Sequence, residues 1–338
     1  MNLKKRLLWI VCLLCLPLLC TEASAEDMPH IGVCMYDGTD TFMSSMRDRL
    51  VEYAQGVAQL SLYDSKNDQN LQNDQVDQLL SAGVDALILN PVDRTAAGYL
   101  IEKARARNIP VVFINREPLL EDMQLFDKVY YVGASAAESG RLSGEIMAEY
   151  FITHSQADKN GDGVVQYVLL KGEPGHLDAE LRSQYALKPL QDAGYGLEKL
   201  QEDTGNWQRL QAQDKMAAFL AAHGDRIECV IANNDDMALG AIDALKAAGY
   251  FSSGRFMPVV GVDATVAAQT AMRQGSLLGT VLNDDVNQAK AALRLAVLLI
   301  RGEDIQTETL GYPLTDGRYV WIPYQPLTAE TLEQPASR

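Results

Sequence analysis

The most regular spacing of oxygen-bearing side chains lies in residues 158–166 (DKNGDGVVQ). Such side chains occupy loop positions 1, 3, 5 and 9: Asp158, Asn160, Asp162 and Gln166. Gly163 occupies position 6, where an EF-hand loop turns sharply, and Val164 at position 7 would add its backbone carbonyl. Because Ca²⁺ takes six to eight oxygen ligands, this spacing predicts a calcium site. The alternative interpretation is an Asx-rich turn that holds no metal.

The loop departs from an EF-hand at its end. Position 12 is Leu169, where an EF-hand carries a bidentate glutamate, and the following residues are typical of a strand rather than a helix. Either a carboxylate from elsewhere in the chain completes the metal shell, or the site binds no ion.

A second group of polar side chains follows four apolar runs of the sequence. Its members are Asn115, residues 233–235 (NND), Asp263 and residues 283–285 (NDD). Each Asn or Asp could simply cap the helix that follows it. Ligands of open α/β sheets, however, bind outside the carboxyl ends of the strands. Four polar strand ends together therefore predict a ligand cleft.

The elements that must position these residues alternate along the chain. Short apolar runs typical of strands buried on both faces lie at 31–36, 86–90, 111–115, 130–132, 165–170, 229–232, 258–262 and 278–282. Amphipathic helical stretches lie between them, at 75–82, 97–107, 136–151, 209–222, 237–248 and 287–301. This alternation predicts doubly wound α/β sheets, and the chain is long enough for two domains.

The N-terminus has the form of a secretory signal. Residues 1–25 carry three basic residues at positions 4–6, continue with an apolar run at 7–19 and end on Ala-Ser-Ala. We expect cleavage after Ala25 and a periplasmic mature protein. The apolar run is shorter than the roughly 20 residues that span a bilayer, which argues against an uncleaved anchor. Cys20 raises a lipoprotein alternative, but Leu19 stands where such signals prefer a small residue.

The net charge narrows the classes of possible partner. The chain has a net charge of −16, and loss of a segment carrying three positive residues and one negative residue leaves −18. Such a surface repels nucleic acid and anionic lipid, and it suits a neutral ligand or a cation.

Cys34 and Cys229 are the cysteines left after cleavage. Both lie in apolar runs in different halves of the chain, so we expect two separate buried thiols.

Seven longer motifs carry a resemblance to a known family. They are YDGTDTFM (36–43), NDQNLQN (67–73), NREP (115–118), LLKGEPGH (169–176), IANNDDM (231–237), GVDA (261–264) and GTVLND (279–284). With them, the mature chain resembles, nearly end to end, the periplasmic D-galactose/D-glucose-binding proteins, the receptors of a sugar ABC importer.

The resemblance implies a type I periplasmic binding protein fold. Two doubly wound parallel-sheet lobes are expected, joined by a three-segment hinge with the ligand between them. The N-terminal lobe is expected to comprise residues 26–134 and 283–319, and the C-terminal lobe residues 135–282 and 320–338.

The resemblance also implies a set of sugar-binding residues. A pyranose shows C–H groups on its faces and hydroxyls on its rim, so its site needs aromatic plates and planar polar groups. The family's stacking positions fall on Phe42 and Trp207. Its polar positions fall on Asp40, Asn115, His176, Asp178, Arg182, Asn234, Asp263 and Asn283. Asp40 resembles the residue that accepts either orientation of the sugar's 4-hydroxyl.

In this family, a loop like residues 158–166 binds structural Ca²⁺, and a distant glutamate completes the shell. Glu228 stands at that glutamate's position, and the expected ligands are Asp158, Asn160, Asp162, Val164, Gln166 and Glu228. Val164 departs from the glutamine that is common there.

The expected function is capture of D-glucose or D-galactose by hinge closure, without catalysis. The expected partners of this monomer are an ABC permease and, as a second partner, a chemoreceptor.

Three rival functions remain to be weighed. The chain could be the receptor for another monosaccharide, such as ribose or xylose. It could be a carbohydrate-active enzyme that uses Asp178 and Asp263 as paired carboxylates. A sugar-responsive transcription regulator would share the fold, but it needs a basic helix-turn-helix where this chain has a signal peptide. Residues 250–257 look longer than in close relatives, and the sequence assigns them no role.

Overall fold

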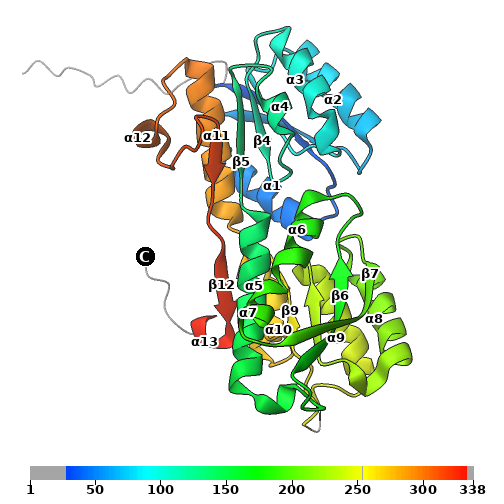
Figure 1. Ribbon diagram of the computed structural model, residues 1–338. Coiled ribbons are helices and arrows are strands. Elements are labelled where there is room, and N and C mark those ends of the chain that lie inside the picture. The colour runs from blue at the N-terminus through cyan, green and yellow to red at the C-terminus, as the bar shows by residue number, and fades with distance from the viewer. Residues whose placement is uncertain (1–27, 253, 333–338) are drawn as a thin grey trace, which may run out of the picture.

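The computed structural model describes residues 28–252 and 254–332, which form two α/β lobes, each built on a six-stranded sheet (Figure 1). The predicted signal peptide, residues 1–25, and its cleavage after Ala25 lie outside the described residues. In the described part of the chain, no helix combines the length and apolar character that crossing a membrane requires.

The sheet of the first lobe has the strand order β11-β5-β4-β3-β1-β2, and every neighbouring pair is parallel. Its strands are β1 (His30–Met35), β2 (Gln59–Asp64), β3 (Ala86–Leu89), β4 (Val111–Ile114), β5 (Val129–Gly133) and β11 (Tyr319–Trp321). The central strands β3 (ALIL) and β4 (VVFI) are wholly buried, as continuous apolar runs predict.

Helices cover both faces of this sheet because the apolar side chains of its central strands need a packing partner on each side. One face packs on α1 (Thr41–Ala54) and α11 (Asp285–Arg301), and the other on α2 (Gln69–Ser81) and α3 (Ala97–Arg105). Shorter helices α4 (Leu120–Met123) and α12 (Thr307–Leu310) complete the lobe.

The sheet of the second lobe has the equivalent order β12-β10-β9-β8-β6-β7. Its strands are β6 (Val164–Lys171), β7 (Gly196–Thr204), β8 (Cys229–Ala232), β9 (Val259–Val260), β10 (Gly279–Leu282) and β12 (Gln325–Thr328). The edge strand β12 runs antiparallel to β10, so this sheet is mixed rather than purely parallel. The expected doubly wound α/β architecture is otherwise confirmed.

Helices also enclose the second sheet. One face packs on α8 (Arg209–His223), α9 (Asp235–Ala247) and α10 (Val266–Arg273), and the other on α5 (Ala136–Thr153) and α7 (Lys188–Asp192). Helix α6 (Leu177–Tyr185) packs on α5, and α13 (Ala329–Leu332) follows β12.

Three segments connect the lobes, namely those between β5 and α5, between β10 and α11, and between β11 and β12 (Figure 1). The last crossing falls later than the expected boundary at 319/320. Val320 and Trp321 pair with Val132 and Gly133 in the first sheet, so the chain leaves this lobe only after Trp321.

The strand order reverses at equivalent points of the two sheets, between β1 and β3 and between β6 and β8. Ligands of doubly wound sheets bind at such switch points, outside the carboxyl ends of the strands. The predicted polar strand ends lie at these edges: Asn115 follows β4, Asn233 follows β8 and Asn283 follows β10.

The two cysteines are separate, as expected. Cys34 lies in β1 and Cys229 in β8, both are fully buried, and neither forms a disulfide. Burial raises the pKa of both thiols, so they remain protonated and behave as small apolar side chains.

Candidate functional site

All ten residues predicted to contact a ligand line one cavity between the lobes. The cavity encloses about 340 Å³ of empty space, open solvent at its mouth included. Three further residues line it that were not predicted as ligands: Tyr36, Met43 and Arg116. Tyr36 and Met43 begin and end the motif YDGTDTFM, and Arg116 follows Asn115 directly, so their place in the motifs was the signal that could have found them.

The first lobe contributes Asp40, Phe42 and Asn115. Asp40 caps α1, because its Oδ1 accepts from the backbone N–H of Met43 at 2.8 Å. Its Oδ2 accepts from the Tyr36 hydroxyl at 2.7 Å. The carboxylate is therefore held at both oxygens. Phe42, in the first turn of α1, packs on the core of its lobe and still lines the cavity.

The second lobe contributes a compact group on the N-terminal turns of α6. His176 caps the helix through Nδ1, which accepts from the backbone N–H of Asp178 at 3.1 Å. Asp178 lies one turn before Arg182 and pairs with its Nη2 at 3.3 Å. The surface ion pair that i,i+4 spacing alone would suggest is thus a nearly buried one, with Arg182 only 5 % exposed.

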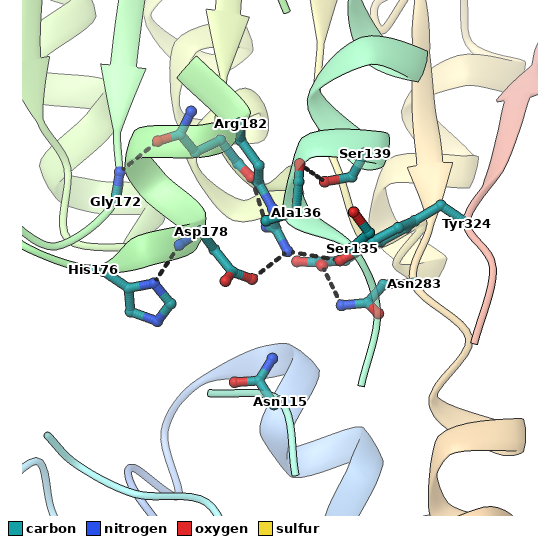
Figure 2. Close-up of polar contacts among 12 residues, drawn as sticks. Asn115, Ser135, Ala136, Ser139, Gly172, His176, Asp178, Arg182, Asn283 and Tyr324 are labelled. Carbon is teal, nitrogen blue, oxygen red and sulfur yellow. Dashed lines mark hydrogen bonds and ion pairs between the residues drawn. The ribbon is translucent and has the colours of Figure 1, made fainter. Parts of the chain in front are cut away.

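Arg182 is the centre of the polar network in this lobe (Figure 2). Its Nη1 donates to the carbonyl of Asn233 at 2.9 Å, and its Nη2 donates to the hydroxyl of Tyr324 at 3.0 Å. Nε has no partner among the described residues, which leaves one donor free for a ligand. Asn115 lies on the opposite side of the cleft, on the first lobe (Figure 2).

Burial shifts the pKa values of the titratable side chains in this group. Burial, followed by the nearby positive charges of Arg116 and Arg182, lowers the pKa of His176 well below its usual value, so the imidazole is neutral. Burial raises the pKa of Asp178, while Arg182 opposes that rise. Because Nδ1 accepts from the Asp178 N–H, the neutral ring carries its proton on Nε2, which leaves a donor for a ligand hydroxyl.

Trp207 provides the second aromatic ring of the cavity. It follows β7, is 9 % exposed, and meets the His176 ring edge-on with 5.0 Å between centroids. The Nδ2 of Asn234 donates to the backbone carbonyl of Trp207 at 3.2 Å. Because Phe42 and Trp207 belong to different lobes, the two rings can pack on a ligand only when both lobes face it.

Three predicted site residues have a left-handed backbone, which non-glycine residues rarely adopt. Their φ angles are +60° at Asn115, +63° at Trp207 and +116° at Asp263, and Ala264 follows with +56°. Such strain persists only where the surrounding structure enforces it. It aims these side chains into the cleft rather than along their strands.

Asp235 enforces the strained turn at Asp263. This buried carboxylate, at the start of α9, accepts from the Thr280 hydroxyl at 2.6 Å and from the backbone N–H of Thr265 at 2.7 Å. The hydroxyl of Thr280 in turn accepts from the N–H of Ala264 at 3.2 Å. The sequence places Asp235 among the polar strand ends but not among the ligand contacts, and the structure agrees, because Asp235 touches the turn and does not line the cavity.

Asn283 connects the hinge to the cavity. Its Nδ2 donates to Asp263 Oδ1 at 3.2 Å, and its Oδ1 accepts from Gln288 Nε2 at 2.6 Å. Burial raises the pKa of Asp263 well above its usual value, and Arg182 opposes that shift. The residue just after β10 thus links α11 of the first lobe to a ligand-facing carboxyl of the second.

The predicted calcium loop, residues 158–166, leads into β6 and includes the first three residues of that strand. Asp158 accepts from the backbone N–H groups of Gly161 and Gly163 at 2.8 and 2.9 Å. Glu228, 2 % exposed, accepts from the N–H of Lys159 at 2.6 Å and from that of Gln166 at 3.0 Å. The structure therefore brings Glu228 against both ends of the loop.

The donor set of this loop suits a hard cation, because it offers carboxylate, amide and carbonyl oxygens and no nitrogen or sulfur ligand. Over residues 28–252 and 254–332, no three His, Cys, Asp or Glu side chains cluster as a metal site by themselves. Any ion here would depend on Asn160, Gln166 and the Val164 carbonyl together with the acids.

Comparisons with known proteins agree with this architecture. Residues 31–304 match the family model described as the periplasmic binding protein domain. The chain is 44 % identical over 306 residues to the D-galactose/methyl-galactoside binding periplasmic protein MglB of Haemophilus influenzae, with 90 % of each chain covered. It is 30 % identical over 253 residues to the ribose import binding protein RbsB of Bacillus subtilis, with 75 % of each covered.

Among solved structures, an ABC transporter solute binding protein from Bacillus halodurans with bound myo-inositol superposes with a TM-score of 0.75. The two chains are 29 % identical, and the match covers 90 % of this chain and 96 % of the other.

The buried Asp235 generates a pH-dependent prediction. Burial raises its pKa from 3.8 to about 7, so the folded protein binds this proton more tightly than the unfolded chain does. Its contribution to the free energy of unfolding is complete below about pH 4 and is lost as pH rises through 7. Between pH 5 and pH 8, the free energy of unfolding of Asp235→Asn should therefore rise by about 2–3 kcal/mol relative to that of the unsubstituted protein, measured by urea denaturation.

The exposed Asp214, in α8 of the same lobe, provides the control. Asp214→Asn should follow the pH dependence of the unsubstituted protein. An identical pH slope for Asp235→Asn would contradict the role given to burial.

Proposed function

The chain belongs to the periplasmic binding protein family, and from this premise we propose that it captures D-glucose or D-galactose between its lobes and delivers the sugar to an ABC importer. Members of this family bind and release their ligands without altering them, so the protein is not an enzyme. The single observation that carries the choice of ligand is the convergence of two aromatic rings and eight planar polar side chains on one cavity.

The cavity's chemistry supports a neutral hexose. Phe42 and Trp207 would pack on the C–H faces of a pyranose, and the polar residues would contact its rim. Asp40, His176, Asn234 and Asn283 lie around the cavity as acceptors or donors for single hydroxyls. Arg182 and Asp178 can each bind adjacent hydroxyls in pairs. The relative named as a galactose-binding protein supports the same ligand class.

Asp40 would accept the 4-hydroxyl of either hexose. Its carboxylate is fixed by Tyr36 and by the cap of α1, and a fixed acceptor can serve a 4-hydroxyl in either orientation. An analogue that lacks a contacted hydroxyl would leave buried partners unpaired, which is costly. Glucose and galactose would thus both bind, whereas deoxy analogues would bind weakly.

Hinge closure would link binding to transport. The ligand-facing residues come from both lobes, so a bound sugar favours the conformation in which the lobes meet. The membrane permease would recognise that closed form in the periplasm. A chemoreceptor would be a second protein that recognises the closed form. The binding protein itself would act as a monomer.

The rival functions have different support. A receptor for ribose or xylose remains the alternative within the family, and the similarity to a ribose import protein favours it. A glycosidase would need one carboxyl to act as an acid and the other as a nucleophile or base. Here Asp178 is paired with Arg182 and Asp263 with Asn283, as in a binding site.

We also propose that residues 158–166 bind Ca²⁺ together with Glu228. The oxygens of Asp158, Asn160, Asp162 and Gln166, the Val164 carbonyl and the Glu228 carboxylate would hold the ion. The contacts of Glu228 with both ends of the loop support this proposal. The ion would cross-link the start of β6 to the start of β8 and would serve stability rather than sugar contact.

Sugar binding is tested by calorimetric titration with glucose, galactose, ribose and xylose. We expect saturable binding of the two hexoses and a change in Trp207 fluorescence. Trp207→Ala and Phe42→Ala should each weaken binding about 10- to 100-fold, because each ring covers one face of the sugar. Tyr99→Ala, which removes an exposed aromatic ring outside the cleft, should leave affinity unchanged. Preference for a pentose, or no binding of any of the four sugars, would refute the assignment.

Calcium binding is tested by thermal unfolding with and without a chelator. EGTA should lower the melting temperature by about 5–10 °C, because an ion bound only to the folded protein stabilises it by mass action. Glu228→Gln should lower it without EGTA and respond little to the chelator. Glu198→Gln, an exposed change on β7, should behave like the unsubstituted protein. A melting temperature that EGTA leaves unchanged would contradict the calcium site.

A further inference from the structure

One ion pair joins the two lobes beside the cavity. Arg116 follows β4 in the first sheet, and Glu173 follows β6 in the second. The Nη2 of Arg116 lies 2.8 Å from Oε2 of Glu173, and their side chains are only 6 % and 20 % exposed. The two residues belong to different lobes, so a movement that separates the lobes at this point must break the pair.

Further contacts within the first lobe fix Arg116. Its Nη1 donates to the carbonyl of Val92, and its guanidinium lies 3.7 Å above the centre of the Tyr36 ring. Tyr36 in turn donates to Asp40. Arg116 therefore connects an interlobe contact to a carboxylate that would bind the sugar.

Glu173 has comparable links in the second lobe and across the cleft. Its Oε1 accepts from Nδ2 of Asn67, a first-lobe residue, at 3.1 Å. Its backbone carbonyl accepts from the N–H of His176 at 3.2 Å, which closes the turn that leads into α6. Arg116 and Asn67 of the first lobe thus both contact the Glu173 carboxylate. Glu173 lies three residues before His176, which lines the cavity.

The pair also lies beside two hollows that adjoin the central cavity. Two surface hollows flank the central cavity, and Glu173 lines both of them. One is bordered by Asp37 and Arg209, and the other by Arg94 and Leu177. The contact between Arg116 and Glu173 thus spans the cleft between two hollows that lead toward the cavity.

We propose that Arg116 and Glu173 form a latch that holds the closed form and slows the release of bound sugar, a role that rests on the function proposed above. Both are positioning residues here, acting through lobe closure. Breaking a largely desolvated charge pair raises the dissociation rate far more than it changes the association rate. The latch therefore predicts a specific kinetic signature.

Stopped-flow measurement of Trp207 fluorescence with glucose tests the latch. Glu173→Gln should raise the dissociation rate constant about tenfold and change the association rate constant less than about twofold. Glu180→Gln is the matched control, because it removes a Lys171–Glu180 pair that lies within the second lobe. It should leave both rate constants unchanged. Equal dissociation rates for the two variants would overturn the latch.

A double-mutant cycle separates the pair from other effects of the same residues. If the residues act together, Arg116→Gln in the Glu173→Gln background should add little to the dissociation rate constant. Effects that multiply fully would overturn the proposal, because Arg116 would then act through the cavity alone.

Small-angle scattering of the sugar-free proteins decides the latch without a ligand. At low ionic strength, Glu173→Gln should have a larger radius of gyration than Glu180→Gln, because the open form is more populated. Equal radii would overturn the latch. If no sugar binds to the unsubstituted protein, the proposed function fails, and this scattering comparison still decides whether the pair favours closure.

Discussion

The site depends on one constraint: in each lobe, parallel strands end at the same edge of the sheet, and these two edges face each other. The segments after β1, β4, β6, β7, β8, β9 and β10 therefore converge on one cavity, although they are spread over most of the chain. The segment after each of these strands delivers between one and four side chains to this point. A ligand held there touches both lobes, so binding and lobe closure become a single equilibrium.

Such a cavity concentrates polar groups where water is scarce, so each must find a partner inside the protein. The two terminal nitrogens of Arg182 are paired with the Asn233 carbonyl, the Tyr324 hydroxyl and Asp178, which come from three separate segments, whereas Nε has no partner among the described residues. The network also fixes orientation, because a planar group with two occupied sides can only present its third side to a ligand. Rigidity at the cleft therefore follows from satisfying buried hydrogen bonds.

The strands that are buried on both faces could be predicted, except for the three-residue β11, and the mostly half-exposed edge strands were missed. The runs that became β3, β4 and β8 are uninterrupted apolar segments. Strands β2 (QLSLYD) and β7 (GLEKLQEDT) lie at sheet edges and are mostly half-exposed, so their polar residues hid them. The antiparallel β12 begins Gln-Pro, and a proline is tolerated in such an edge strand.

The sequence by itself determined the alternation of strands and helices, the polar residues at strand ends and the oxygen spacing of residues 158–166, because these features depend on neighbours within one element. Only the tertiary structure decided that Tyr324 contacts Arg182, that Glu228 closes on Lys159 and Gln166, and that Arg116 meets Glu173. It also decided which carboxyls have raised pKa values, Asp235 among them. Contacts between distant segments depend on how whole lobes pack. The spacing of residues within one element therefore does not encode which distant residues come into contact.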